Sequence, residues 1–82
     1  MHNDIGIERH RVIDAGNENG WRRSAAPNFD LWHRGDREVQ VFYFEDGSVN
    51  SAQSIDHRTK ATVDATTPAG LVAQVIYWLA TP

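Results

Sequence analysis

The chain has 82 residues, no cysteine and a formal net charge of −3 at pH 7. This length accommodates one small domain, and the absence of cysteine excludes disulfides and any zinc-finger ligand spacing. The charge balance disfavours general nucleic-acid binding, which usually requires an excess of cations. A domain of this size buries only about 60% of its unfolded surface, so we expect self-association to add stability.

The basic residues are biased, with seven Arg and a single Lys, Lys60. Because Arg codons are mostly GC-rich and Lys codons AT-rich, this bias predicts a GC-rich genome, such as that of a bacterium or its phage. The chain does not start with a basic segment followed by an apolar run. The longest apolar run, near the C-terminus, is shorter than the roughly 20 residues that a bilayer-spanning helix needs. We therefore expect a cytoplasmic protein, in a bacterium or in an infected host cell.

The N-terminal segment contains scattered apolar residues followed by a strong turn signal. The apolar residues are Ile5, Ile7, Val12 and Ile13. They predict a strand near residues 5–14, and residues 1–15 are expected to be either an edge strand or partly disordered. The Asn-Glu-Asn-Gly sequence at 17–20 then turns the chain into residues 21–23.

Two turn signals divide the central segment into strands: "RGD" at residues 34–36 and "EDG" at residues 45–47. Each is interpreted as a three-residue hairpin loop, with Gly47 in the left-handed position of a bulge. The opposed pairs are then Phe29–Val41, Leu31–Val39, Val41–Ser51, Tyr43–Val49 and Phe44–Ser48. One core face follows, made of Phe29, Leu31, Val39, Val41, Tyr43 and Val49. A two-residue loop at either turn would exchange the faces.

The C-terminal stretch predicts a helix over residues 68–80, with Thr67 as N-cap and Pro68 in the first helical position. Its sheet-facing stripe is Leu71, Val72, Val75, Ile76 and Leu79. The other side carries Tyr77 and Trp78, so the helix is apolar nearly all round. We expect a partner chain to cover this second side.

These elements predict an α+β fold. Residues 56–66 are polar and add at most a short edge strand at 59–63. The whole chain, 1–82, is expected to form one two-layer domain. It would consist of an antiparallel β-meander of four to five strands with one C-terminal helix packed on one face.

In this register, Trp32, Phe42 and Phe44 project from the face opposite the helix. Either the N-terminal segment or a protein partner is expected to cover them, because aromatic residues and Arg are enriched at interface hot spots. The candidate partner-binding residues are Trp32, Phe42, Phe44, Tyr77 and Trp78 as apolar anchors, with Arg34 and Arg37 at the rim.

The favoured function is a small non-enzymatic interaction or accessory domain that forms a homodimer and binds a protein, without cofactor or metal. The first alternative is a nucleic-acid-binding domain that combines guanidinium–phosphate contacts with stacking on unpaired bases. Its candidate residues are Arg22, Arg23, Arg34, Arg37, Trp21 and Trp32. A remote alternative is a hydrolase-like enzyme using His57 and Asp56 as an acid–base pair. No nucleophile elbow accompanies that pair.

Overall fold

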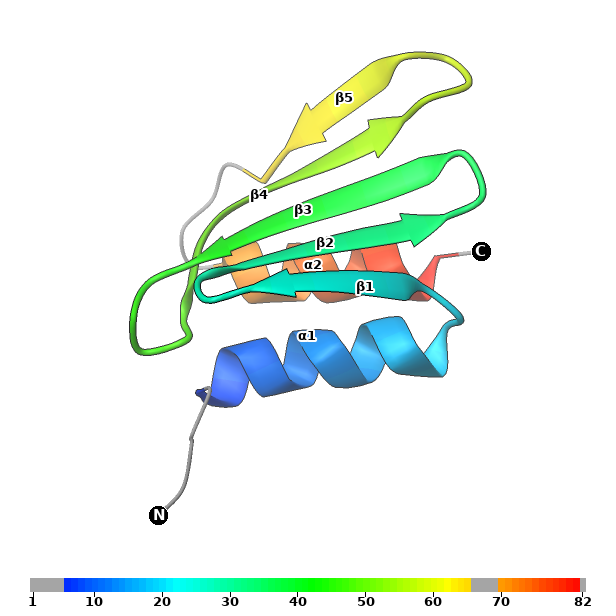
Figure 1. Ribbon diagram of the computed structural model, residues 1–82. Helices are drawn as coiled ribbons and strands as arrows, with labels where there is room; N and C mark the ends of the chain where they lie inside the picture. Colours follow the sequence, from blue (N-terminus) through cyan, green and yellow to red (C-terminus); the bar gives the residue numbers. More distant parts are fainter. Residues whose placement is uncertain (1–5, 66–69, 82) are drawn as a thin grey trace.

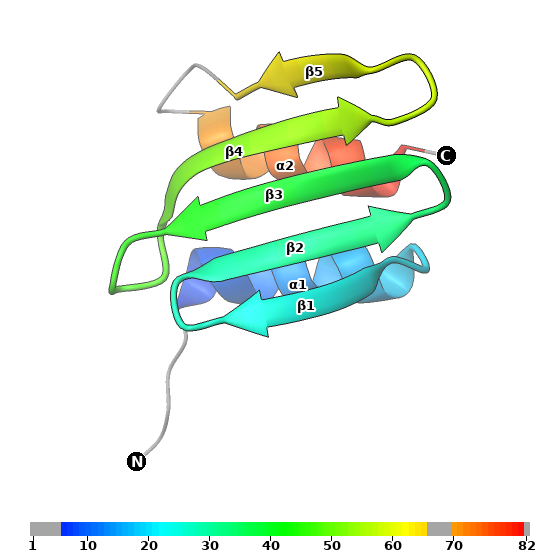
Figure 2. The ribbon, with the colours of Figure 1, turned by 45° about the horizontal axis from the view of Figure 1, so that its top comes forward.

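The fold is a five-stranded antiparallel meander with two helices on one face. The computed structural model describes residues 6–65 and 70–81. The elements are α1 (Ile7–Glu18), β1 (Arg22–Ala26), β2 (Phe29–Arg34), β3 (Arg37–Tyr43), β4 (Val49–Asp56), β5 (Ala61–Asp64) and α2 (Leu71–Ala80). The strands are ordered as in the chain, and both helices lie behind the same face of the sheet (Figure 1, Figure 2). The predicted α+β class, meander and C-terminal helix are thus confirmed.

The N-terminal segment is helical where the structure describes it, so the strand predicted near residues 5–14 is wrong. The buried positions of α1 are Arg9, Val12 and Gly16, which share one side of the helix. Only Val12 among them is a large apolar residue. The segment therefore lacks the hydrophobic periodicity from which a helix could have been predicted.

The turn signal at residues 17–20 is real, but it ends a helix rather than joining two strands. Trp21 N–H donates to the Gly16 carbonyl at 3.0 Å, and Gly20 N–H donates to the Asn17 carbonyl. This pair of bonds is the Schellman arrangement, in which the residue at the Gly20 position is left-handed. It redirects the chain from α1 into β1.

The hairpin between β2 and β3 has a two-residue loop instead of the predicted three-residue loop. Arg34 pairs with Arg37 across it. Because side chains alternate along a strand, this difference exchanges the faces of β2. Trp32 is fully buried on the helix side. Phe29 and Leu31, predicted in the core, lie half-buried on the other side.

The hairpin between β3 and β4 follows the prediction. Phe44 N–H donates to the Ser48 carbonyl at 2.9 Å, and Tyr43 pairs with Val49. A bulge then shifts the register, so Val41 pairs with Ala52 rather than with Ser51. The predicted core residues of this hairpin are buried, namely Val39, Val41, Tyr43 and Val49.

The α2 helix packs under β3 and β4 through Val75 and Leu79, which are both fully buried. Its predicted N-terminal residues Thr67 and Pro68 lie outside the described residues. Trp78 is only 7% exposed, so its predicted place on an outer face is wrong.

Trp78 is turned toward β4 and β5, where it lines a hollow together with Ala61 and Val63. Tyr77, in contrast, is 66% exposed as predicted. Across residues 6–65 and 70–81, no helix combines the length and apolarity that crossing a membrane requires.

Candidate functional site

The sheet face turned away from both helices is the candidate site, and it is called the open face here. Its composition follows from the pairing register and the buried position of Trp32. The open-face residues are Arg22, Ser24, Ala26, Phe29, Leu31, His33, Glu38, Gln40, Phe42, Ser51, Gln53, Ile55, Thr62 and Asp64. Phenylalanine side chains gather at one end of this face, and Arg22, His33 and Glu38 lie at the other.

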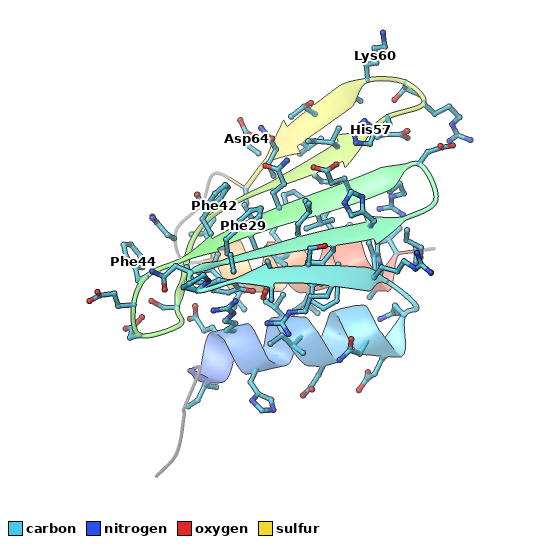
Figure 3. All side chains as sticks on the ribbon, in the orientation of Figure 1. Phe29, Phe42, Phe44, His57, Lys60 and Asp64 are labelled. Atoms are coloured by element: carbon cyan, nitrogen blue, oxygen red, sulfur yellow. The ribbon has the colours of Figure 1, made fainter. Side chains whose placement is uncertain are left out.

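Three phenylalanines form the apolar end, which we call the aromatic patch: Phe29, Phe42 and Phe44. Phe29 on β2 is directly opposite Phe42 on β3, and their ring centroids lie 4.7 Å apart at an interplanar angle of 36°. Phe42 is 42% exposed and Phe44, just beyond β3, is 54% exposed (Figure 3). Phe42 projects away from the helices as predicted. The described part of the N-terminal segment forms α1 on the other face of the sheet and does not cover Phe42 or Phe44.

A shallow hollow of about 190 Å³ adjoins the aromatic patch, next to the end of β5. Its lining consists of Phe42, Ser51, Ala52, Gln53, Asp64 and Ala65. Asp64 supplies the one ionisable side chain of this lining, and its carboxylate accepts a hydrogen bond from Gln53 Nε2 at 2.9 Å. Small-molecule sites usually measure about 300–1,000 Å³, so this hollow suits a single protruding side chain better than a cofactor.

Carboxylates surround the aromatic patch. Glu45 and Asp46 follow Phe44 in the β3–β4 turn, and Asp64 lies at the end of β5. Asp46 accepts from the backbone N–H of Ser48 at 2.9 Å and from its hydroxyl at 2.6 Å, and these bonds lower the pKa of Asp46. None of the ion pairs among the described residues uses these three carboxylates. A partner that binds the aromatic patch therefore meets negatively charged side chains around it.

The other end of the open face is polar and centres on Glu38. Glu38 Oε1 lies 2.9 Å from His57 Nε2 and 4.0 Å from His33 Nδ1. Gln40 Nε2 donates to Glu38 Oε2 at 2.6 Å. The Gln40 hydrogen bond, followed by the His57 hydrogen bond and the charge of His33, lowers the pKa of Glu38 against the opposing effect of burial.

The acid–base pair proposed from the sequence does not form, since His57 contacts Glu38 and not Asp56. The Asp56 carboxylate instead accepts from the backbone N–H of Arg58 at 2.9 Å. Within the part of the chain that the structure describes, no three His, Cys, Asp or Glu side chains are grouped to hold a metal ion.

The arginines assigned to the partner rim are engaged inside the fold. Arg34 donates to the carbonyl oxygens of Asn19 and Thr81, and Arg37 also donates to Thr81. These carbonyls lie at the C-terminal ends of α1 and α2, where carbonyl oxygens have no hydrogen-bond donor within the helix. The Arg34 guanidinium also stacks on Trp21, 4.6 Å from the ring centroid. Both arginines therefore hold the helix ends to the β2–β3 turn.

The nucleic-acid set is not assembled into one exposed surface. Trp21 and Trp32 are 5% and 0% exposed, so neither indole can stack on a base. Trp21 Nε1 donates to the Leu79 carbonyl. Arg23 binds Asp30 at 2.9 Å, which leaves Arg22 as the member of the set that lies on the open face. Trp32, being buried, also cannot serve as a partner anchor.

A buried ionic cluster escaped the sequence analysis. The fully buried carboxylate of Asp30 accepts from Arg9 Nη2 at 2.9 Å, Arg23 Nε at 2.9 Å and the Tyr43 hydroxyl at 2.8 Å. Burial and the Asp30 charge raise the pKa of Tyr43, so its hydroxyl remains a donor. Neither Arg9 nor Asp30 was among the candidate residues predicted from the sequence. The cluster joins α1 to the sheet and has a structural role.

Comparison of the chain with protein-family models, curated proteins and solved structures found no match. The open face must therefore be interpreted from its own geometry.

Proposed function

We propose that the chain is a non-enzymatic protein-binding domain whose aromatic patch binds an apolar segment that also carries Lys or Arg. The observation that supports it is the contact between half-buried Phe29 and exposed Phe42, beside a side-chain-sized hollow and near carboxylates that form no ion pair among the described residues. Exposed aromatic residues contribute strongly at protein interfaces. A cation within about 6 Å of a phenylalanine ring is attracted to the ring. Phe42 and Asp64 line the same hollow, so a Lys or Arg side chain placed there could contact both the ring and the carboxylate.

A nucleic-acid partner is less well supported, although an open antiparallel sheet with exposed aromatic rings is a surface on which bases can stack. Phosphates would meet the carboxylates of Glu45, Asp46 and Asp64. Affinity for nucleic acid depends on cations that neutralise phosphates. Arg34 and Arg37, which would have supplied them, are bound to helix ends.

Self-association through α2 is also less well supported. It was expected because Tyr77 and Trp78 were predicted on the outer side of the helix. Trp78 is buried within the single chain, so Tyr77 is left as the large exposed apolar residue of that helix. One aromatic side chain is a small interface compared with the 20–30 residues per side that are typical of stable complexes.

The test uses two displayed peptide libraries with the same randomised apolar positions, one flanked by Lys and Arg and the other by Asp and Glu. We expect selection against the immobilised protein to recover binders from the basic library. The change Phe42→Ser should abolish their binding. Tyr77→Ser is the matched control, because it removes an exposed aromatic residue from the opposite side of the molecule.

Three outcomes would overturn the proposal. The acidic library could yield the stronger binders, or binding could survive Phe42→Ser. The third is that a single-stranded oligonucleotide, titrated at low salt, binds while no peptide does. That result would establish the nucleic-acid alternative, because phosphate contacts are strongest at low salt.

A further inference from the structure

Among residues 6–65 and 70–81, no strand pairs with the outer edge of β5. This strand is last in the strand order, and all four of its residues are exposed, including Val63 at 53%. In Figure 1 it extends beyond the region covered by the helices. An edge of this kind presents unpaired backbone N–H and C=O groups to which another strand can bind.

The register shows which backbone groups of β5 point outward. Ala65 N–H donates to the Ala52 carbonyl at 3.0 Å, so Ala65 faces β4. In an antiparallel pair, the N–H and C=O of one residue point to the same side, and successive residues alternate. Val63 therefore also faces β4. The backbone groups of Thr62 and Asp64 are directed away from the sheet.

The sequence of this edge is complementary to itself. When a second copy is paired antiparallel and centred on Thr62, Thr62 lies opposite its counterpart. Ala61 then lies opposite Val63 of the second copy, and Lys60 lies opposite Asp64. The two copies are related by a two-fold axis perpendicular to the sheet, so each of the Ala61–Val63 and Lys60–Asp64 pairs occurs twice. The open faces of both copies lie on the same side. Opposite charges in directly opposed positions stabilise a strand pair.

We propose that the free edge of β5 is a homodimerisation site, in which two copies pair about Thr62 and join their sheets into one of ten strands. Lys60 has φ 62° and lies in the turn directly before β5, so it contributes through its long side chain rather than through the ladder. Lys60 and Asp64 lie at the two ends of β5 (Figure 3).

The helix side of the same edge favours the second copy as well. Ala61 and Val63 border a hollow of about 440 Å³ that reaches Trp78, because α2 packs under β3 and β4 and does not extend beneath β5. In the Thr62-centred register, Ala61 and Val63 of the two copies meet along this side. Four small apolar side chains then form a continuous strip.

The other edge, β1, does not offer the same contact. Its sequence is Arg-Arg-Ser-Ala-Ala, so pairing of β1 with its own copy centred on Ser24 would set each arginine opposite an alanine and would give no pair of opposite charges. Pairing β1 with β5 of another copy would be head-to-tail and would not close. Self-pairing of β5 closes with two subunits and also sets opposite charges against each other.

The dimer should be weak, because a strand of four residues buries less than the roughly 1,200–2,000 Å² typical of stable interfaces. We expect a dissociation constant on the order of 100 μM. The dimer contact shares Asp64 with the hollow beside Phe42, but its test does not involve a partner protein.

Sedimentation equilibrium over about 10 μM to 1 mM measures the association. The wild-type mass should rise above 9.2 kDa with concentration. The change Thr62→Pro removes an N–H that the monomer does not use, so the fold should persist while dimerisation weakens at least about tenfold. Val63→Pro is the opposing control, because it removes an N–H directed at β4 and should destabilise the monomer.

A charge exchange tests the register. Lys60→Asp or Asp64→Lys alone should weaken the dimer about tenfold at low salt, because each brings like charges together twice. The double exchange should restore wild-type affinity. A mass of 9.2 kDa at every concentration would overturn the proposal. Dimerisation unaffected by Thr62→Pro, or a double exchange no better than the singles, would overturn it equally.

Discussion

The two faces of the sheet each carry a carboxylate with several partners, and they use it differently. Asp30 on the helix side has no exposed surface, whereas Glu38 on the open face retains 12% side-chain exposure. The histidines beside Glu38 are about half exposed, with side chains at 46% and 57%. Water can replace a partner of Glu38 but not one of Asp30. Burial, and not the type of residue, decides which carboxylate holds the fold together.

The aromatic residues follow the same division. All three tryptophans, Trp21, Trp32 and Trp78, are buried on the helix side, while Phe42 and Phe44 are exposed at the apolar end of the open face. The helix side is thus filled by large side chains that fit one another. The open face keeps its rings available for contact, which makes it the side on which substitutions should affect binding more than stability.

The largest effect expected is for Asp30→Ala. It leaves the guanidinium of Arg9, whose side chain is 8% exposed, without its carboxylate and removes the acceptor of the Tyr43 hydroxyl. Breaking one side of a buried ion pair costs about 3–5 kcal/mol, a large part of the roughly 5–15 kcal/mol that stabilises a small domain. Urea unfolding measures the loss.

The open-face counterpart Glu38→Gln is the control for this experiment and should change the free energy of unfolding by less than about 1 kcal/mol at pH 7. Equal losses for the two variants would contradict the contrast between the faces.

A smaller effect is expected for Gly16→Ala in α1. A Cβ atom at this position would overlap the six-membered ring of Trp32. Overpacking of a core costs about 1–3 kcal/mol, which should exceed the gain of about 1 kcal/mol that Ala normally brings to a helix. The thermal midpoint should therefore fall, although the substitution would stabilise an exposed helix.

The same change in a Trp32→Phe background tests the cause. The smaller ring makes room for the methyl group, and it removes an indole N–H that has no hydrogen-bond partner among the described residues. The two substitutions together should cost less than the sum of their separate effects. Simple additivity would show that Gly16 is required for another reason.

This contrast between faces was only partly predictable from sequence. The β3 strand and the β3–β4 turn were assigned correctly, because the Tyr43–Val49 pairing follows from the turn residues. The β2 strand was assigned to the wrong face because "RGD" accommodates either a two- or a three-residue loop, and one residue moves Trp32 from the open face to the core. Local turn chemistry does not distinguish these loops; tertiary packing against Gly16 does.

The α1 helix and the Asp30 cluster were missed for a related reason. The buried side of α1 includes a charged residue and a glycine, so its burial depends on Asp30, 21 residues after Arg9, and on Trp32, 16 residues after Gly16. Arg9 is buried only because Asp30 and the carbonyls of the β1–β2 turn receive its donors. Long-range polar pairing of this kind leaves no periodic pattern in the sequence.

The smallest effect expected is the pH dependence of the Glu38 contribution. Its pKa in the folded chain lies below the ordinary value of 4.5, first because of the Gln40 hydrogen bond and then because of His57 and His33. The unfolded chain therefore binds more protons near pH 4, and stability rises with pH there. The contribution is complete above pH 4.5 and disappears as the pH falls through the folded-state value.

Urea unfolding of wild type and Glu38→Gln from pH 7 to pH 3 should show a difference that shrinks toward zero at the acidic end. Gln40→Ala should reproduce part of the neutral-pH loss, since it removes the largest cause of the pKa shift while leaving the histidines in place. A difference that grows as the pH falls would mean that Glu38 is held in its protonated form. The hydrogen bonds of Glu38 with Gln40 and His57 would then need another assignment, because here the ionised carboxylate of Glu38 is taken as the acceptor of both.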